Sequence, residues 1–202
     1  MGLEARCQPA PSLPSARPSV HRPRRGAREW SIVITIERVS WDDPRGVALR
    51  TAMDEDMHVR YARPADDPEP QHVTDARDRA LAVDPAGVVA SILAIDDGGQ
   101  AVGHVAVRRL RTAIDGAAPT DELEVKRLMV LETARGQRVA TTLLDEAEVV
   151  AREDGAARLV LQTGDKQPEA VALYGKHGWR RIQNYEPYAA VMPFSLCFAK
   201  DV

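Results

Sequence analysis

The residues Arg135-Gly136-Gln137-Arg138-Val139-Ala140 decide the fold and the site that this sequence predicts. They form a glycine-bearing loop between a strand-like run, residues 123–131, and an amphipathic helix pattern, residues 137–153. Backbone N–H groups at the N-terminus of a helix point at one spot, and the helix dipole favours negative charge there. We therefore expect the loop to bind a pyrophosphate group, with the hydroxyls of Thr141 and Thr142 in the first turn of the helix.

Alternating and helical apolar patterns extend outward from this loop in both directions. Short β-branched or apolar runs predict strands at residues 31–36, 88–95, 101–110, 123–131, 158–163, 180–185 and 195–200. Capping residues and apolar stripes predict helices that start at Asp43-Pro44 and span residues 73–83, 137–153 and 168–177. The turn Asp96-Asp97-Gly98-Gly99-Gln100 predicts an antiparallel hairpin, and residues 110–120 are predicted to be a loop.

A second motif follows the loop. It reads Gln167-Pro168-Glu169-Ala170-Val171-Ala172-Leu173-Tyr174 and continues with His177-Gly178-Trp179. Together the two motifs resemble the GNAT superfamily of acetyl-CoA-dependent N-acetyltransferases, over residues 34–200. The resemblance implies an α/β (α+β) fold, with a mixed, mostly antiparallel sheet of six to seven strands flanked by about four helices. It also implies acetyl-CoA as co-substrate, with no metal.

The resemblance assigns binding residues one by one. Main-chain groups of Leu128, Met129 and Val130 would hold the pantetheine arm as an added strand would. The phosphates would bind the loop and first helical turn, which comprise Arg135, Gly136, Gln137, Arg138, Val139, Ala140 and Thr141. Gln167 stands where many relatives carry an asparagine that bonds the pantetheine amides, and Tyr174 is the tyrosine that returns a proton to the thiolate. Arg138 replaces the usual glycine; because a residue entering a right-handed helix needs no positive φ, we expect arginine to fit.

Glu124 is the candidate general base. It precedes Arg135 by 11 residues, the spacing at which histone-type GNAT enzymes place that carboxylate. Period-two alternation places Glu122, Glu124, Lys126, Leu128 and Val130 on one face of the strand. A carboxylate beside apolar residues is expected to have a raised pKa and to accept a proton. The alternative is a glutamate that is solvated or paired with Lys126.

The remaining histidines and cysteines carry no recognisable site. His104 and His177 lack triad or metal partners in the sequence and are interpreted as structural residues, and Trp179 is interpreted as a core residue. Cys7 and Cys197 lie at opposite ends of the chain and are interpreted as unpaired thiols in a reducing cytoplasm. P-loop and dinucleotide-binding motifs are missing from the sequence.

Composition separates the chain into a tail and one domain. Residues 1–28 hold six arginines, five prolines and one acidic residue, and are predicted to be disordered. They contribute +5 to the net charge of −3, so residues 29–202 carry −3 − 5 = −8. A targeting peptide or a nucleic-acid-binding arm remains open for the tail, but an unstructured extension is favoured. No apolar run is long enough to cross a membrane.

These observations favour an enzymatic function over two alternative functions. We expect acetyl transfer from acetyl-CoA to a primary amine of a small molecule or peptide, by direct attack in a ternary complex, in the cytoplasm. The acidic domain weakly favours a cationic acceptor, nucleic acid is not expected as a partner, and a homodimer remains open. The rivals are a non-catalytic acyl-CoA-binding module and nucleic-acid binding through the tail.

Overall fold

A computed structural model describes residues 33–110 and 121–202. The predicted disordered tail and most of the predicted loop at residues 110–120 lie outside the described residues. The strands are β1 (Thr35–Val39), β2 (Val88–Ile95), β3 (Ala101–Arg109), β4 (Glu122–Val130), β5 (Arg158–Thr163), β6 (Arg180–Ile182) and β7 (Leu196–Asp201). The α-helices are α1 (Pro44–Arg60), α2 (Gln71–Leu81), α3 (Val139–Asp154), α4 (Pro168–Lys176) and α5 (Tyr188–Val191). Single 3-10 turns occupy Pro85–Gly87 and Glu132–Ala134.

The predicted fold class is confirmed, with differences at the ends of elements. The seven strands form one mixed sheet in the order β1-β2-β3-β4-β5-β7-β6. Within the described residues the first strand begins at Thr35, where its pairing with β2 starts opposite Ile95, and residues 31 and 32 of the predicted strand lie outside the described residues. The predicted strand 180–185 ends at Ile182, and the short helix α5, which the sequence pattern did not predict, follows it.

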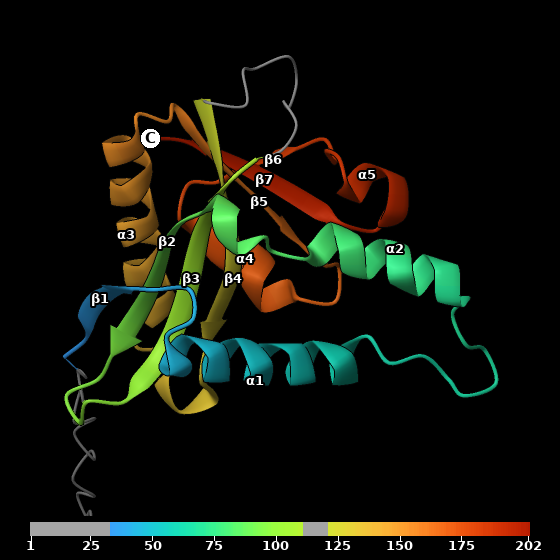
Figure 1. Cartoon of the computed structure of the whole chain (residues 1–202), viewed down its shortest axis with the longest axis horizontal. Coiled ribbons are helices and arrows are strands. Elements are labelled where there is room, and N and C mark those ends of the chain that lie inside the picture. Colours follow the sequence, from blue (N-terminus) through green and yellow to red (C-terminus); the bar gives the residue numbers. More distant parts are fainter. Residues whose placement is uncertain (1–32, 111–120) are drawn as a thin grey trace, which may run out of the picture. The chain divides into compact units, whose positions relative to one another are not determined.

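Two apolar layers cover the sheet. Figure 1 shows α3 along one side of the sheet, away from α1, α2 and α5. The larger core joins the sheet to α3 and α4, and it includes Leu143, Tyr174 and Phe198. On the opposite face, smaller clusters form around Leu49 of α1 and around Tyr188 of α5. Each strand residue of the central sheet therefore faces either the α3/α4 layer or the α1/α2/α5 layer.

The one parallel contact in the sheet ends early. β4 and β5 pair from Glu122–Arg158 to Val125–Leu161, and no pair follows. On its other side, β4 stays paired with β3 as far as Gly103–Val130. The two parallel strands therefore separate after Val125, and the second half of β4 has a free edge. We call the point of separation the fork.

A β-bulge lies immediately beyond the fork. Arg127 has φ 58°, and the register steps from Ala106–Lys126 to His104–Met129, so β4 uses three positions where β3 uses two. The extra residue reverses the alternation of side chains. Before the bulge Leu123 and Val125 face the α3/α4 core, and after it Leu128 and Val130 face the same core. The prediction that Glu124, Lys126, Leu128 and Val130 share one face is therefore wrong.

A buried histidine holds the bulge in place. The Nδ1 atom of His104 lies 3.1 Å from the carbonyl oxygen of Arg127, so it carries the proton and donates. The Nε2 atom then accepts from Ser91 at 3.1 Å and from Arg50 at 3.3 Å. Burial lowers the pKa of His104 to about 4, although the bond to the Arg127 carbonyl opposes the shift. His104 is thus neutral near pH 7 and bridges three elements, which agrees with its predicted structural role.

Candidate functional site

The predicted phosphate loop is a tight turn that leads into α3. Gly136 has φ 76° and Arg138, the N-cap residue of α3, has φ 64°. The expectation that Arg138 needs no positive φ is wrong, since it adopts the left-handed conformation that a glycine would favour. No side chain caps this end of α3, so the amides of its first turn have no capping partner within the described residues. Free amides and the helix dipole together fit an anionic ligand.

The free edge of β4 leads from the fork to this loop. Among the described residues, β4 pairs only with β3 past Val125, so the other edge of residues 128–130 has no strand partner. An extended ligand can bind such an edge as an additional strand would. The side chain of Arg135 connects the two regions, because its Nε atom lies 3.3 Å from the carbonyl oxygen of Val130. The geometry fits a long ligand with an anionic end at α3 and an amide-bearing arm along β4.

Tyr174 projects from α4 into the α3/α4 core. It is 6% exposed and contacts the rings of Trp179 and Phe198, with centroids 6.0 Å and 5.6 Å away. Burial raises the pKa of the Tyr174 hydroxyl, so the phenol stays protonated across the neutral range. Leu128, Val130 and Val139 pack against or belong to the same apolar cluster. Tyr174 therefore lies on the side of the sheet that also holds the free half of β4 and the start of α3. Gln167 is the N-cap residue of α4, and its side chain forms no capping bond.

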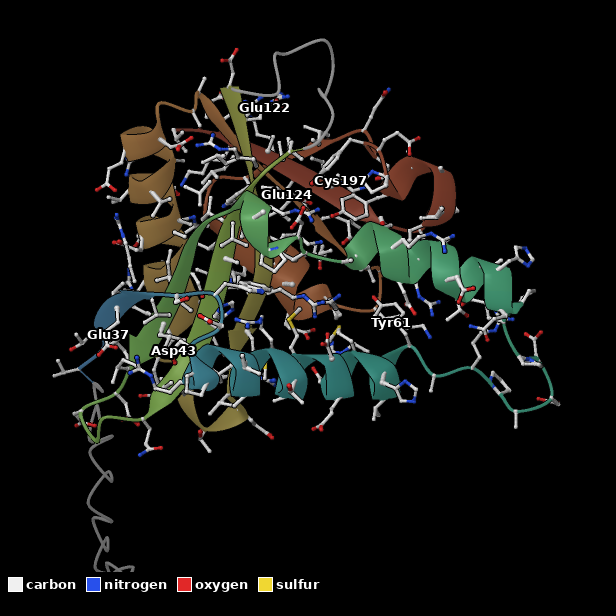
Figure 2. The ribbon with its side chains drawn as sticks, viewed as in Figure 1. Glu37, Asp43, Tyr61, Glu122, Glu124 and Cys197 are labelled. Atoms are coloured by element: carbon white, nitrogen blue, oxygen red, sulfur yellow. The ribbon has the colours of Figure 1, made fainter. Side chains whose placement is uncertain are left out.

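Glu124 lies on the other face of the sheet, in a fully buried ionic network. Arg108 donates to its Oε2 atom at 2.7 Å, while the hydroxyls of Tyr185 and Tyr188 donate to Oε1 at 2.9 Å and 2.7 Å. Figure 2 shows Glu124 inside the molecule, close to Cys197. Burial alone would raise the pKa of Glu124. The charges of Lys126 and Arg108 and the bond from Tyr188 outweigh burial, so its pKa is lowered. The expected raised pKa is therefore wrong, and the role of Glu124 as base stays a prediction.

Sequence reasoning missed most of this network. Lys126 is 6% exposed, and its Nζ atom lies 2.8 Å from the Tyr188 hydroxyl and 4.9 Å from the centre of the Tyr188 ring. The alternative in which Lys126 pairs directly with Glu124 is replaced by an arrangement in which Tyr188 bridges the two side chains. The tyrosine pair Tyr185-x-x-Tyr188 offered a signal in the sequence, but its partner carboxylate lies 61 residues away.

His177 belongs to a cluster with two carboxylates whose residue types could bind a metal ion. Ligand atoms of Asp145, Glu148 and His177 lie within 4.8 Å of one another. The Lys200 ammonium contacts the Glu148 carboxylate, and His177 Nε2 lies 2.9 Å from Asp145. A cation already neutralises part of this cluster, and the residues tie β7 to α3 and to the end of α4.

Among the described residues, no helix is long and apolar enough to span a membrane.

Comparison with known proteins identifies relatives of this architecture. The sequence model of the acetyltransferase (GNAT) family matches residues 49–179. A protein from Azospirillum brasilense named IAA acetyltransferase is 40% identical over 79 residues, which are 39% of this chain and 51% of that protein. N-acetyltransferase family 8 member 2 from Rattus norvegicus is 33% identical over 90 residues, 45% of this chain and 38% of that protein. The chain thus spans about half, or less, of the curated relatives it matches.

Solved structures show the same arrangement of helices and strands. A Klebsiella pneumoniae protein, provisionally classed as an acyl-CoA N-acyltransferase, superposes with a TM-score of 0.61 at 25% identity. The alignment covers 83% of this chain and 97% of that one. A GNAT-family acetyltransferase from Staphylococcus aureus superposes with a TM-score of 0.58 at 17% identity, covering 84% and 99% of the two chains. The second similarity concerns the fold alone.

Proposed function

The chain belongs to the acetyltransferase (GNAT) family, and on that premise we propose that it transfers an acetyl group from acetyl-CoA to a primary amine of a small molecule or peptide. The observation that carries the proposal is the free edge of β4, which runs from the fork to the uncapped N-terminus of α3. An acyl-CoA has the matching shape, because its pyrophosphate and its amide-bearing arm are joined in one chain. Its thioester would then reach the fork.

The amine attacks the thioester directly in a ternary complex. Cys197, the one free thiol in the part of the chain that the structure describes, is buried, and burial raises its pKa. It is therefore a poor acyl carrier, since the thiolate is the reactive form. When the C–S bond breaks, the thiolate needs a proton, and Tyr174 supplies it from the α3/α4 side. Tyr174 then recovers a proton from the newly acylated nitrogen.

An acyl-CoA-binding module without turnover is the rival function. It would use the same loop and the same edge of β4, so binding alone does not separate the two proposals. We propose the enzyme because a buried, protonated phenol lies in the same cluster as the free half of β4. A binding module would need no proton donor at that position.

Thiol release from acetyl-CoA, measured against a panel of amines, tests the activity. The panel should hold amino acids, polyamines, aminoglycosides and lysine peptides. We expect release that depends on one class of acceptor, and binding of acetyl-CoA without release for every class would favour the module.

A glycine pair tests the location of the coenzyme. Gly136 and Gly99 both have positive φ, 76° and 78°, and nothing lies within 4 Å of an added Cβ at either residue. Gly136→Val and Gly99→Val therefore strain the backbone equally, but only Gly136 lies in the loop before α3. We expect Gly136→Val to weaken acetyl-CoA binding at least about tenfold and Gly99→Val to leave it unchanged. Equal affinities in a calorimetric titration would place the coenzyme elsewhere.

A further inference from the structure

The buried network behind the fork holds more positive than negative charge. Arg108 and Lys126 are both cationic groups, while Glu124 is, among the described residues, the only carboxylate bonded to Arg108 or to the tyrosine hydroxyls that join the network. Glu124 is 0% exposed and Lys126 is 6% exposed, so water screens neither charge well. An unbalanced charge in such surroundings is costly, so the pKa of the group that holds its proton least tightly is lowered. Arginine does not release its proton in proteins, so the group is Lys126.

Among the described residues, two groups that act on Lys126 favour its ammonium form and two oppose it. Glu124 on the same strand favours the ammonium, whereas Arg108 of β3 and Arg127 of β4 oppose it. The guanidinium of Arg127 is itself paired with Asp54 of α1. Cys197 of β7 also favours the ammonium, and burial and the charge of Glu124 hold the tyrosines of the α5 region protonated. Burial is the largest influence, and it lowers the pKa of Lys126 to about 8.

Lys126 lies at the fork, where a proton acceptor could take part in the proposed reaction. The last β4 residue with a β5 partner is Val125, so Lys126 is the first residue of β4 past the fork. Its side chain lies on the α1/α2/α5 face and Tyr174 lies on the opposite face. A proton acceptor and a proton donor therefore flank the fork from its two sides. The carboxylate of Glu124, in contrast, already accepts from Arg108 and two tyrosines and has no exposed surface.

From this arrangement we infer that Lys126, rather than Glu124, accepts the proton of the acceptor ammonium, and that Glu124 is a positioning residue acting through Tyr188. The inference rests on the proposed acetyl transfer. The neutral Nζ atom takes one proton from R–NH₃⁺, which leaves R–NH₂ with a free electron pair. That pair forms the C–N bond at the thioester carbonyl, the C–S bond breaks, and the thiolate takes the Tyr174 proton. Tyr174 regains the second nitrogen proton, and Lys126 releases its own to water, so one proton leaves per turnover.

The decisive experiment compares the pH profile of kcat in the wild type with those of Lys126→Met and Lys126→Arg, using the acceptor that the wild type acetylates. We expect the wild-type rate to rise with pH, with a midpoint near pH 8 and a plateau about one unit above it. Met fills the space without an amine and Arg keeps the charge without releasing a proton. Both variants should lose at least about tenfold in kcat near pH 7.5 and should show no midpoint near pH 8. Lys176→Met, an exposed lysine on α4, is the matched control.

Two further measurements separate chemistry from packing. Acetyl-CoA affinity should stay within about twofold in all three variants, because the Lys126 side chain lies on the α1/α2/α5 face of the sheet, away from the loop before α3. Lys126→Ala should regain rate when trimethylamine is added, because that tertiary amine accepts a proton but cannot form a stable amide. A wild-type rate or an unchanged midpoint in Lys126→Arg or Lys126→Met would overturn the inference.

The Glu124→Gln variant, which retains Lys126, is a second and independent test of the inference. Loss of the negative charge favours the neutral amine, so the midpoint of the kcat profile should move to lower pH while the plateau remains. If Glu124 is the base, the plateau disappears instead and the inference fails. If the wild type releases no thiol with any amine, the proposed acetyl transfer is wrong. If the wild type is active and the Lys126 variants have the same rate, only the role inferred for Lys126 is wrong.

Discussion

Aromatic side chains surround Tyr174 and keep its phenol protonated. The phenol is buried against Trp179 and Phe198, and burial raises its pKa, so the hydroxyl is protonated across the neutral range. We expect Tyr174→Phe to lower kcat by about ten- to a thousandfold, because only the hydroxyl is lost. Acetyl-CoA affinity should stay nearly intact in a calorimetric titration. Unchanged turnover between pH 6 and 9 would remove Tyr174 from the chemistry.

A substitution at Arg138 can separate the effect of its strained backbone on stability from the effect of its guanidinium on acetyl-CoA binding. Its φ of 64° is one that glycine adopts without cost, while arginine there is strained by about 1 kcal/mol. Arg138→Gly relieves that strain but removes a guanidinium from the phosphate loop. We expect the variant to keep or gain thermal stability and to bind acetyl-CoA more weakly, with a smaller salt dependence, if the guanidinium pairs with a phosphate. Equal affinity in low and high salt would assign the loop's contribution to its amides alone.

The close packing of α3 against the sheet depends on Gly103 of β3. A Cβ atom at this position would lie 3.0 Å from side-chain atoms of Leu143 and Val139 and 3.2 Å from the Met129 carbonyl oxygen. Val139 and Met129 belong to the two structures that the coenzyme is proposed to bind. A methyl group at residue 103 therefore pushes the start of α3 away from the free half of β4.

Gly103→Ala should accordingly affect both stability and binding. We expect a loss of about 1–3 kcal/mol of unfolding free energy, the usual range for overpacking, together with weaker acetyl-CoA binding. Gly87→Ala is the control, since nothing lies within 4 Å of its added Cβ and its φ is not positive. Chemical denaturation and a binding titration of both variants provide the measurement. A destabilised Gly103→Ala protein with full affinity would show that α3 tolerates the shift.

At the scale of the whole molecule, the buried charge of Lys126 links folding to pH. Its pKa falls from 10.5 to about 8 on folding. Between these values the unfolded chain binds more protons, so stability rises as the pH rises from 8 and this gain is lost below 8. From pH 7.5 to 9.5 the lysine alone contributes about 2 kcal/mol, roughly 5 °C in Tm. Burial raises the pKa of Cys197, which opposes the gain in the same range.

Lys126→Met isolates the contribution of the lysine. Cys197 is present in both proteins, and the charge of Lys126 is the smallest influence on its pKa, so the lysine dominates the difference between the two Tm-versus-pH curves. The wild type should gain Tm relative to the variant as the pH rises from 7.5 to 9.5, and the variant should be the more stable of the two at pH 7.5. Parallel curves in differential scanning calorimetry would mean that Lys126 keeps its ordinary pKa.

The sequence by itself determined the order of the seven strands and of helices α1 to α4, the loop at residues 135–138 and the motif that contains Tyr174. These depend on signals that extend over a few residues: apolar spacing, proline and glycine at helix ends, and short runs of fixed residue types. The seven-stranded sheet and its flanking helices follow from that order, and the comparison with solved structures agrees.

Only the tertiary structure decided the surroundings of Glu124 and the face on which the second half of β4 lies. A single extra residue at Arg127 reverses the alternation, and a period-two pattern cannot show where such a bulge falls. The partners of Glu124 come from 16, 61 and 64 residues away, so its charge balance depends on packing between distant elements. Protonation follows from that packing, because burial and neighbouring charge, rather than position in the sequence, set a pKa.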